Sequence, residues 1–240
     1  MITIINKNDA PPIKEEDLSE LNKFSIQRGI DLSFEWKDGQ YWLHSDRNEE
    51  RAIGIEIDRE LTRHEEFFKK SSLQKELLAR AVGVKGPYRP AVLDLTAGLL
   101  GDSLLLLSFG CEVWATERHP VIRFLIESAL KNAHHPRVES FHFLPGDALD
   151  VLRNPPLVDV FYFDPMFEDA NPKASPKKEM RIFRNVIGSD LDAQNVFLEA
   201  RKLKPKRLVV KRPRHSVTLS EKASVEYIGK STRYDVYFSV

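Results

Sequence analysis

From about residue 90 onward, short continuous apolar runs alternate with segments that have a helical pattern. The apolar runs predict strands at residues 91–95, 112–117, 140–144, 158–164 and 207–211. Between them, apolar residues recur every three or four positions, which predicts helices at 102–109, 120–132, 148–153 and 190–203. Strands that are apolar throughout and separated by helices are typical of a parallel sheet covered by helices on both faces. We therefore expect an α/β fold with a doubly wound, mostly parallel sheet.

The end of the chain has a different pattern. Two further candidate strands, at 225–228 and 234–240, are separated by a short connection. Parallel neighbours need a crossover connection, and this one is too short for that. The sheet should therefore end in an antiparallel hairpin.

The pattern before residue 60 predicts a small N-terminal α+β subdomain at 1–60, ahead of the main domain at 61–240. Its expected elements are a strand at 2–5, a helix at 14–28, a hairpin that turns at Asp38–Gly39 and a half-buried strand at 52–58. Asp-Gly supplies the positive φ angles of a tight hairpin turn. A helical pattern follows at 60–82.

Composition narrows the class of protein. The chain has 240 residues, of which 42% are hydrophobic, enough for a sizeable buried core. No apolar stretch approaches the roughly 20 residues of a membrane span, and the N-terminus lacks the features of a secretory signal. The single cysteine, Cys111, excludes an internal disulfide and a cysteine metal cluster. We expect a soluble, cytoplasmic protein with neither a membrane partner nor a metal.

Charge is distributed unevenly although the net charge is zero. Residues 1–169 carry 20 Lys and Arg against 29 Asp and Glu, whereas residues 170–240 carry 16 against 7. A basic C-terminal part is most simply explained by solubility. It is also typical of a protein that binds a polyanion such as nucleic acid.

The first candidate site is the turn that follows the first strand of the main domain, Thr96-Ala-Gly-Leu-Leu-Gly-Asp102. In doubly wound sheets, ligands bind at the carboxyl ends of strands, where glycines allow close approach to the backbone. Gly98 and Gly101 form an incomplete dinucleotide fingerprint, and the Gly-Lys-Ser/Thr of a phosphate loop is absent. A plain strand-to-helix turn explains this segment equally well.

Two acidic residues strengthen the case for a nucleoside site. Glu117 ends the next strand about 20 residues later, where a carboxylate can accept hydrogen bonds from both ribose hydroxyls. Asp147 follows Gly146 after the third strand and could face an adenine amino group. Taken alone, Asp147 is better explained as the N-cap of the next helix.

The most informative motif is Asp164-Pro-Met-Phe167, at the end of the fourth strand. It is close to the Asp/Asn-Pro-Pro-Tyr/Phe signature of methyltransferases that act on exocyclic amines of nucleobases. Such an amine is a poor nucleophile, so a carboxylate and a backbone carbonyl that accept its hydrogens hold it in line for attack. An aromatic side chain at the fourth position stacks on a base turned out of its helix.

Together with Leu93-Asp-Leu-Thr-Ala-Gly98, Glu117-Arg-His-Pro120, Lys177-Lys-Glu-Met-Arg181 and Val209-Val-Lys-Arg-Pro213, this motif makes the chain resemble a known family. From about residue 75 to the end, it resembles the small-subunit ribosomal RNA methyltransferase J family. The resemblance implies a Rossmann-like class I methyltransferase that uses S-adenosylmethionine. It also implies transfer to the exocyclic 2-amine of a guanosine in small-subunit (16S) rRNA, as naked RNA or as the assembled subunit. Where the family usually reads Gly-Leu-Gly-Arg-Asp, this chain has Gly98-Leu-Leu-Gly-Asp102.

The residues and the resemblance together give the expected site. For the cofactor we expect Asp94, Gly98, Gly101, Asp102, Glu117, Arg118, Gly146, Asp147 and Asp164. For catalysis we expect Asp164, Pro165 and Phe167, without a metal ligand. For RNA phosphates we expect the basic residues that follow the fourth and fifth strands, Lys177, Lys178, Arg181, Lys211 and Arg212. Two alternatives remain: an adenine amine methyltransferase that acts on DNA or RNA, and a non-catalytic nucleotide-binding factor in ribosome assembly.

Overall fold

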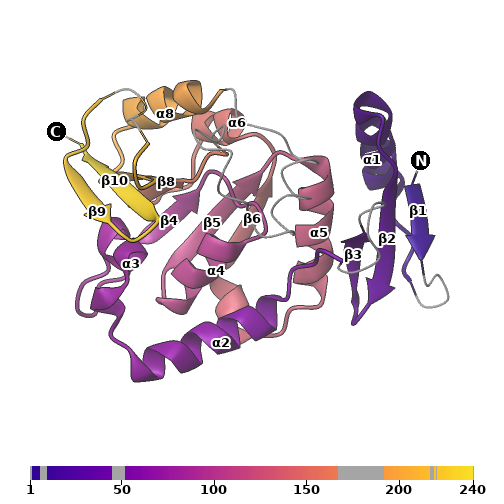
Figure 1. The fold of residues 1–240 in the computed structure, drawn as a ribbon, viewed down its shortest axis with the longest axis horizontal. Coiled ribbons are helices and arrows are strands. Elements are labelled where there is room, and N and C mark those ends of the chain that lie inside the picture. Colours follow the sequence, from indigo (N-terminus) through magenta and orange to yellow (C-terminus); the bar gives the residue numbers. More distant parts are fainter. Residues whose placement is uncertain are drawn as a thin grey trace.

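The computed structural model describes residues 2–5, 10–44, 52–166, 192–216, 219 and 221–239. Its larger sheet has the strand order β6-β5-β4-β7-β8-β10-β9 (Figure 1). Its strands are β4 (Ala91–Asp94), β5 (Glu112–Glu117), β6 (Phe141–Pro145), β7 (Val160–Phe163), β8 (Arg207–Pro213), β9 (Val225–Ile228) and β10 (Thr232–Phe238). β4 to β8 pair in parallel, and β10 pairs antiparallel with both β8 and β9. The predicted mostly parallel sheet with a C-terminal antiparallel hairpin is confirmed.

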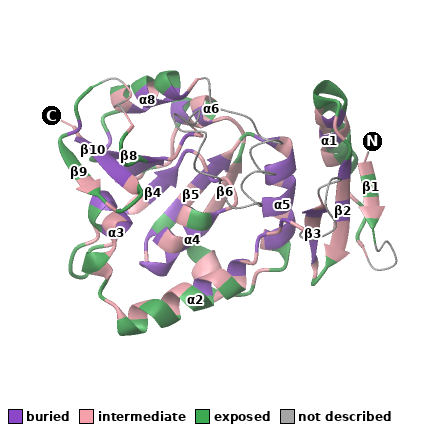
Figure 2. Ribbon diagram, viewed as in Figure 1, coloured by how far each residue is buried: buried purple, intermediate pink, exposed green. Residues whose placement is uncertain are grey.

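Helices cover both faces of this sheet. One face packs against α2 (Ile57–Lys70), α3 (Leu77–Val82), α4 (Gly101–Ser108) and α5 (Pro120–Lys131). The other face packs against α6 (Ala148–Arg153) and α8 (Ala193–Lys202). Because side chains alternate along a strand, Val92 faces the first layer and Leu93 the second, and both are fully buried. The central strands are accordingly buried along their length (Figure 2).

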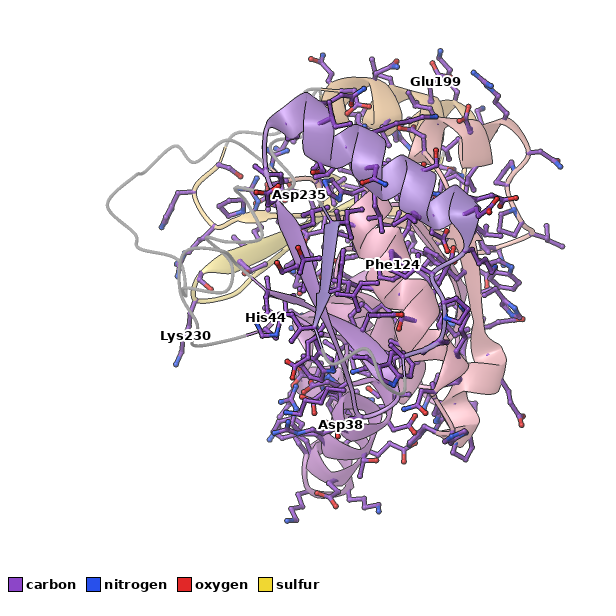
Figure 3. The ribbon with its side chains drawn as sticks, turned by 90° about the vertical axis from the view of Figure 1, so that its right-hand side faces the viewer. Asp38, His44, Phe124, Glu199, Lys230 and Asp235 are labelled. Carbon is purple, nitrogen blue, oxygen red and sulfur yellow. The ribbon has the colours of Figure 1, made fainter. Side chains whose placement is uncertain are left out.

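A second sheet of three strands contains β1 (Ile2–Ile5), β2 (Leu32–Lys37) and β3 (Gln40–His44). The predicted hairpin turn is confirmed, since Asp38 and Gly39 have φ angles of 53° and 78°. With α1 (Glu15–Arg28), this sheet lies beside α5, whose Phe124 is labelled in the side view of Figure 3. The rings of Phe124 and Phe34 meet edge to face, with their centroids 5.1 Å apart.

The junction between the two parts differs from the expectation. Ile53 forms a single bridge with Leu43, and the chain then leaves the sheet, so the predicted strand at 52–58 is wrong. The predicted alternation of buried isoleucines is present, but α2 begins at Ile57 and runs through the expected boundary at residue 60. The hydrophobic core is shared by the N-terminal elements and the main sheet.

The helical stretch expected at 60–82 is also interrupted. α2 ends at Lys70, a short 3-10 turn (η2, Leu73–Lys75) follows, and α3 begins at Leu77. The Ser72 hydroxyl accepts a hydrogen bond from the backbone N–H of Gln74. Serine side chains compete for backbone hydrogen bonds in this way, which favours helix ends over helix interiors.

Leu100, in the turn after β4, has an unusual backbone conformation. Its φ of 63° lies in the left-handed region, although its side chain is fully buried in the core. Non-glycine residues pay about 1–2 kcal/mol for this conformation. Burial of the leucine side chain offsets that strain.

A comparison of glycine and alanine substitutions should reveal this strain. At Leu104, inside α4, alanine should be more stable than glycine by about 1 kcal/mol, the usual helix preference. At Leu100 the order should reverse by a similar amount, because glycine relieves the left-handed strain. Urea unfolding of the four single variants measures both differences. The same Ala-over-Gly order at the two positions would show that Leu100 is unstrained.

Candidate functional site

The carboxyl ends of β4, β5, β6 and β7 bring the predicted motifs to one edge of the sheet. The turn after β4 is tied to its two neighbouring strands through the backbone. Leu95 N–H donates to Tyr162 O in β7 at 2.9 Å, and Ala97 N–H donates to Thr116 O in β5 at 2.9 Å. The glycine turn is therefore held at the centre of this edge.

The buried Asp94 side chain holds this turn through hydrogen bonds. Its side chain accepts hydrogen bonds from Thr96 N–H at 3.0 Å and from the Ser103 hydroxyl at 2.6 Å. Asp94 is 1% exposed, so it supports the turn from inside the protein. Its predicted part in cofactor binding would be through this turn. Burial raises the pKa of this carboxyl to about 7, against the two hydrogen bonds, and the charges of Asp102 and Asp164 raise it further.

Asp94 should make stability depend on pH. An ordinary aspartate in the unfolded chain ionises near pH 4, whereas the folded Asp94 keeps its proton to about pH 7. The contribution of Asp94 to the free energy of unfolding is therefore complete at acid pH, and it is lost as the pH rises through 7. Asp94→Asn cannot ionise but can still accept from Thr96 N–H.

Between about pH 5 and pH 8, the parent should lose about 3 kcal/mol of unfolding free energy relative to Asp94→Asn. Urea unfolding of both proteins across this range measures the difference. Parallel stability curves would show that the carboxyl is ionised throughout.

Glu117 closes the turn from β5. Its Oε2 accepts from Gly98 N–H at 2.9 Å, and its Oε1 accepts from His119 N–H at 2.8 Å. Glu117 is half-buried beside the turn, as a ribose ligand requires.

Asp147 and Arg118 lie at the next strand end. Asp147 caps α6 by accepting from Leu149 N–H at 2.8 Å, which confirms its predicted role as N-cap. Arg118 makes ion pairs with Asp147 at 3.4 Å and with Asp192 at 2.7 Å. The hydrogen bond from Arg118 lowers the pKa of Asp192. Contact of either residue with the cofactor stays a prediction.

Asp164 follows β7 and faces the same region. Its backbone N–H donates to the Thr96 hydroxyl at 2.7 Å, which joins the Asp-Pro motif to the turn after β4. Pro165 is buried and Met166 packs against the core. Phe167, the expected stacking residue, lies outside the described residues.

A cluster of polar groups surrounds Asp164. The Lys211 ammonium donates to Asp102 Oδ2 at 2.7 Å and to Asp164 Oδ2 at 2.8 Å. Asp102 Oδ2 also accepts from the Tyr162 hydroxyl at 2.5 Å. Burial alone would lower the pKa of Lys211, but the charges of Asp164 and Asp102 raise it well above its ordinary value. Burial, with help from these carboxylates, raises the pKa of Tyr162.

The structure places the residues expected to contact RNA phosphates in different surroundings. Lys211 directs its ammonium at two carboxylates of the site, and Arg212 lies on the opposite face of the sheet. The Arg212 side chain is 3% exposed, and its Nε lies 3.9 Å from Asp235 Oδ2. This burial does not support contact with a phosphate, which stays a prediction. Burial lowers the pKa of Arg212. Lys177, Lys178 and Arg181 lie outside the described residues.

The residues present fit S-adenosylmethionine. A Cβ placed on Gly101 or Gly146 would meet no atom within 4 Å, so there is open space beside both glycines. A cavity of about 220 Å³ next to the turn is lined by Gly54, Ile55, Glu56, Glu60, His64, Leu99, Gly101 and Leu104. Ligand pockets are usually about 300–1,000 Å³. This cavity is smaller, and Glu117, Asp147 and Asp164 are not among its lining residues. Among the described residues, no three His, Cys, Asp or Glu side chains are grouped to hold a metal ion.

Three features of this edge were not predicted from the sequence: the contacts of Thr96, the presence of Tyr162 and the inward position of Lys211. The alternation of strand residues carries a signal for the last two. Tyr162 lies two residues before Asp164, and Lys211 two residues after the buried Val209, which pairs with Tyr162. Residues at such spacing share a face.

Comparisons with known proteins agree with this geometry. A family model described as "Putative SAM-dependent methyltransferase" matches residues 19–239. The solved SAM-dependent methyltransferase NGO1261 from Neisseria gonorrhoeae has a TM-score of 0.67 and 23% identity, covering 99% of this chain and 95% of its own. At this identity, the likeness supports the fold.

Curated relatives are more similar in sequence. The ribosomal RNA small subunit methyltransferase J of Shewanella denitrificans is 35% identical over 92% of each chain. Proteins of the same name from Thioalkalivibrio sulfidiphilus and Laribacter hongkongensis are 43% and 45% identical over 69% and 67% of this chain. The matches span 69% and 60% of those two relatives. The chain therefore belongs to the SAM-dependent methyltransferases and, among them, to the ribosomal RNA small subunit methyltransferase J family.

Proposed function

We propose that this protein transfers a methyl group from S-adenosylmethionine to the exocyclic 2-amine of a guanosine in small-subunit ribosomal RNA. The names of the relatives support the RNA substrate. The observation that carries the proposed chemistry is the Asp164 carboxylate, which ends β7 and is fixed beside the glycine turn by Thr96 and Lys211. Such a substrate favours a cytoplasmic location, where ribosomes are assembled.

When bound, S-adenosylmethionine supplies a methyl group activated by a sulfonium. The chain's own residues do the positioning. Glu117 and the turn that it closes would hold the ribose. Asp164 would accept a hydrogen bond from the guanine amine and orient the nitrogen toward the methyl group. Phe167, next to this site in sequence, is our candidate for stacking on the base.

We also propose that Lys177, Lys178 and Arg181 contact the RNA backbone. Their support is their position in sequence, directly after the Asp-Pro-Met-Phe motif, in the part of the chain where basic residues exceed acidic ones. Phosphate contacts of this kind orient a nucleic acid without reading its sequence.

The test is transfer of a labelled methyl group to small subunits and to naked small-subunit rRNA, both from cells that lack the enzyme. Nuclease digestion and mass spectrometry then identify the methylated nucleoside. We expect N2-methylguanosine at a single position. N6-methyladenosine would instead assign the adenine amine, and cofactor binding without transfer to either substrate would indicate a non-catalytic binding factor.

A further inference from the structure

Lys211 lies on the strand β8, on the face that carries the reaction site. Its neighbour two residues earlier, Val209, is fully buried under the α3–α4 layer, and Arg212 points to the opposite layer. The Lys211 ammonium lies 2.7 Å from Asp102 Oδ2 and 2.8 Å from Asp164 Oδ2. One cation thus bridges a carboxylate at the start of α4 and a carboxylate after β7.

Four described ionisable groups act on this bridge or on its neighbours: Tyr162, Tyr234, Asp94 and Glu76. Tyr162 of β7 donates its hydroxyl to Asp102, and Tyr234 of β10 pairs in register with Lys211. Asp94 of β4 feels the charges of both bridged carboxylates, and Glu76 before α3 acts on Tyr234. The Lys211 side chain is 27% exposed, so solvent screens this cluster only in part.

We propose that Lys211 is a positioning residue that keeps the Asp164 carboxylate ionised and oriented to accept the amine of the target base. This inference rests on the proposed function. Two carboxylates that share a site repel each other, and one of them tends to bind a proton unless a cation neutralises them. A protonated carboxyl becomes a hydrogen-bond donor. It would then lose part of its capacity to accept the hydrogens of an amine.

This role differs from the two simpler ones. A lysine that grips RNA phosphate would hold its ammonium toward the RNA, and its loss would change the salt dependence of RNA binding. A lysine with a purely structural role would change stability but leave the pH dependence of the reaction unchanged. The bridge between two carboxylates predicts a change in that pH dependence.

The experiment compares Lys211→Gln, Lys211→Met and Lys211→Arg with the parent, using single-turnover methyl transfer to small subunits at saturating S-adenosylmethionine from about pH 5.5 to pH 9. Lys211→Gln keeps a hydrogen-bond donor but removes the charge. Lys206→Met is the matched control, since Lys206 pairs with Asp159 at the opposite end of the sheet. Melting temperature and cofactor affinity confirm that each variant is folded.

In both neutral variants, we expect the rate at pH 7 to fall by about 10²-fold, the loss typical of a misplaced reacting group. The acid limb of the pH–rate profile should move upward by roughly 1–3 pH units, as expected when a neighbouring cation is removed. Their rates should therefore fall further below that of the parent as the pH becomes more acid. Lys211→Arg should keep the parent's acid limb, and Lys206→Met should keep both rate and profile.

The outcomes separate this inference from the proposed function. A parent that transfers no methyl group to small subunits or rRNA would overturn the proposed function, and this role of Lys211 with it. An active parent together with a neutral variant that has the parent's pH profile would overturn the role of Lys211 alone. A salt slope of RNA binding that falls by about 0.7–0.9 in Lys211→Gln would assign Lys211 to a phosphate instead.

A double variant covers the case in which neither neutral single variant folds. Asp102→Asn/Lys211→Gln removes the cation together with one of its two carboxylates, so no uncompensated pair remains. Its acid limb should lie close to that of the parent, because the repulsion on Asp164 is gone. A limb displaced as far as we expect for Lys211→Gln alone would contradict the charge argument.

Discussion

Replacing Asp164 with alanine should lower the rate of methyl transfer by at least about 10²-fold, the effect of losing alignment at a reacting centre. The carboxylate ends β7, and its backbone is tied to Thr96 in the cofactor turn. Alanine keeps this backbone link but removes the acceptor for the amine. RNA binding should stay nearly the same. Single-turnover transfer at saturating S-adenosylmethionine measures the effect on the reaction itself.

Two further variants sharpen this test. Asp164→Asn keeps one acceptor oxygen, so its rate should lie between those of the parent and the alanine variant. Asp159→Ala removes an aspartate from the opposite end of the same strand region, where it pairs with Lys206. Its rate per folded molecule should match the parent. A near-normal rate in Asp164→Ala would exclude the proposed chemistry.

Glu117→Ala should weaken S-adenosylmethionine binding by about 1.5–3 kcal/mol, the range for hydrogen bonds to a charged group. This corresponds to about 10- to 150-fold in affinity. The change removes the ribose acceptor and also the acceptor for Gly98 N–H, so the turn loses a contact that holds it toward β5. Isothermal titration calorimetry gives the affinity directly.

The matched control is Glu112→Ala, at the start of the same strand, where Glu112 contacts His142 at 3.0 Å. Glu112 is exposed and distant from the carboxyl edge of the sheet, so cofactor affinity should not change. Unchanged affinity in a folded Glu117→Ala protein would remove Glu117 from the cofactor site.

Sequence patterns predicted the fold where periodicity and chemistry agree locally. The strand at 112–117 and the helix at 148–153 have the expected bounds. Glu112 and Glu117 bracket the apolar centre of the strand, and the N-cap Asp147 marks the start of the helix. The predicted strand at 52–58 failed because its alternating isoleucines reach the core without a ladder of hydrogen bonds. Periodicity reports which residues are buried, whereas strand pairing depends on a partner distant in sequence.

In the site, too, local features could be predicted from the sequence, whereas contacts between distant residues could not. Sequence placed Glu117 and Asp164 at strand ends, and the sheet brings both beside the glycine turn. For Lys211, sequence indicated a basic residue at the active edge but not its partners. Those partners, Asp102 and Asp164, are 109 and 47 residues away along the chain. No local pattern reports a contact of that range.

The position of β10 has a consequence for how the chain folds. β10 is the last strand in sequence, yet it lies between β8 and β9. β9 therefore has no neighbour in the sheet until β10 is present. A hairpin forms in about 1–10 μs because its contacts are local, whereas pairing with β8 must close a longer loop. We expect β9 and β10 to form a two-stranded ribbon first and to dock on β8 as one unit.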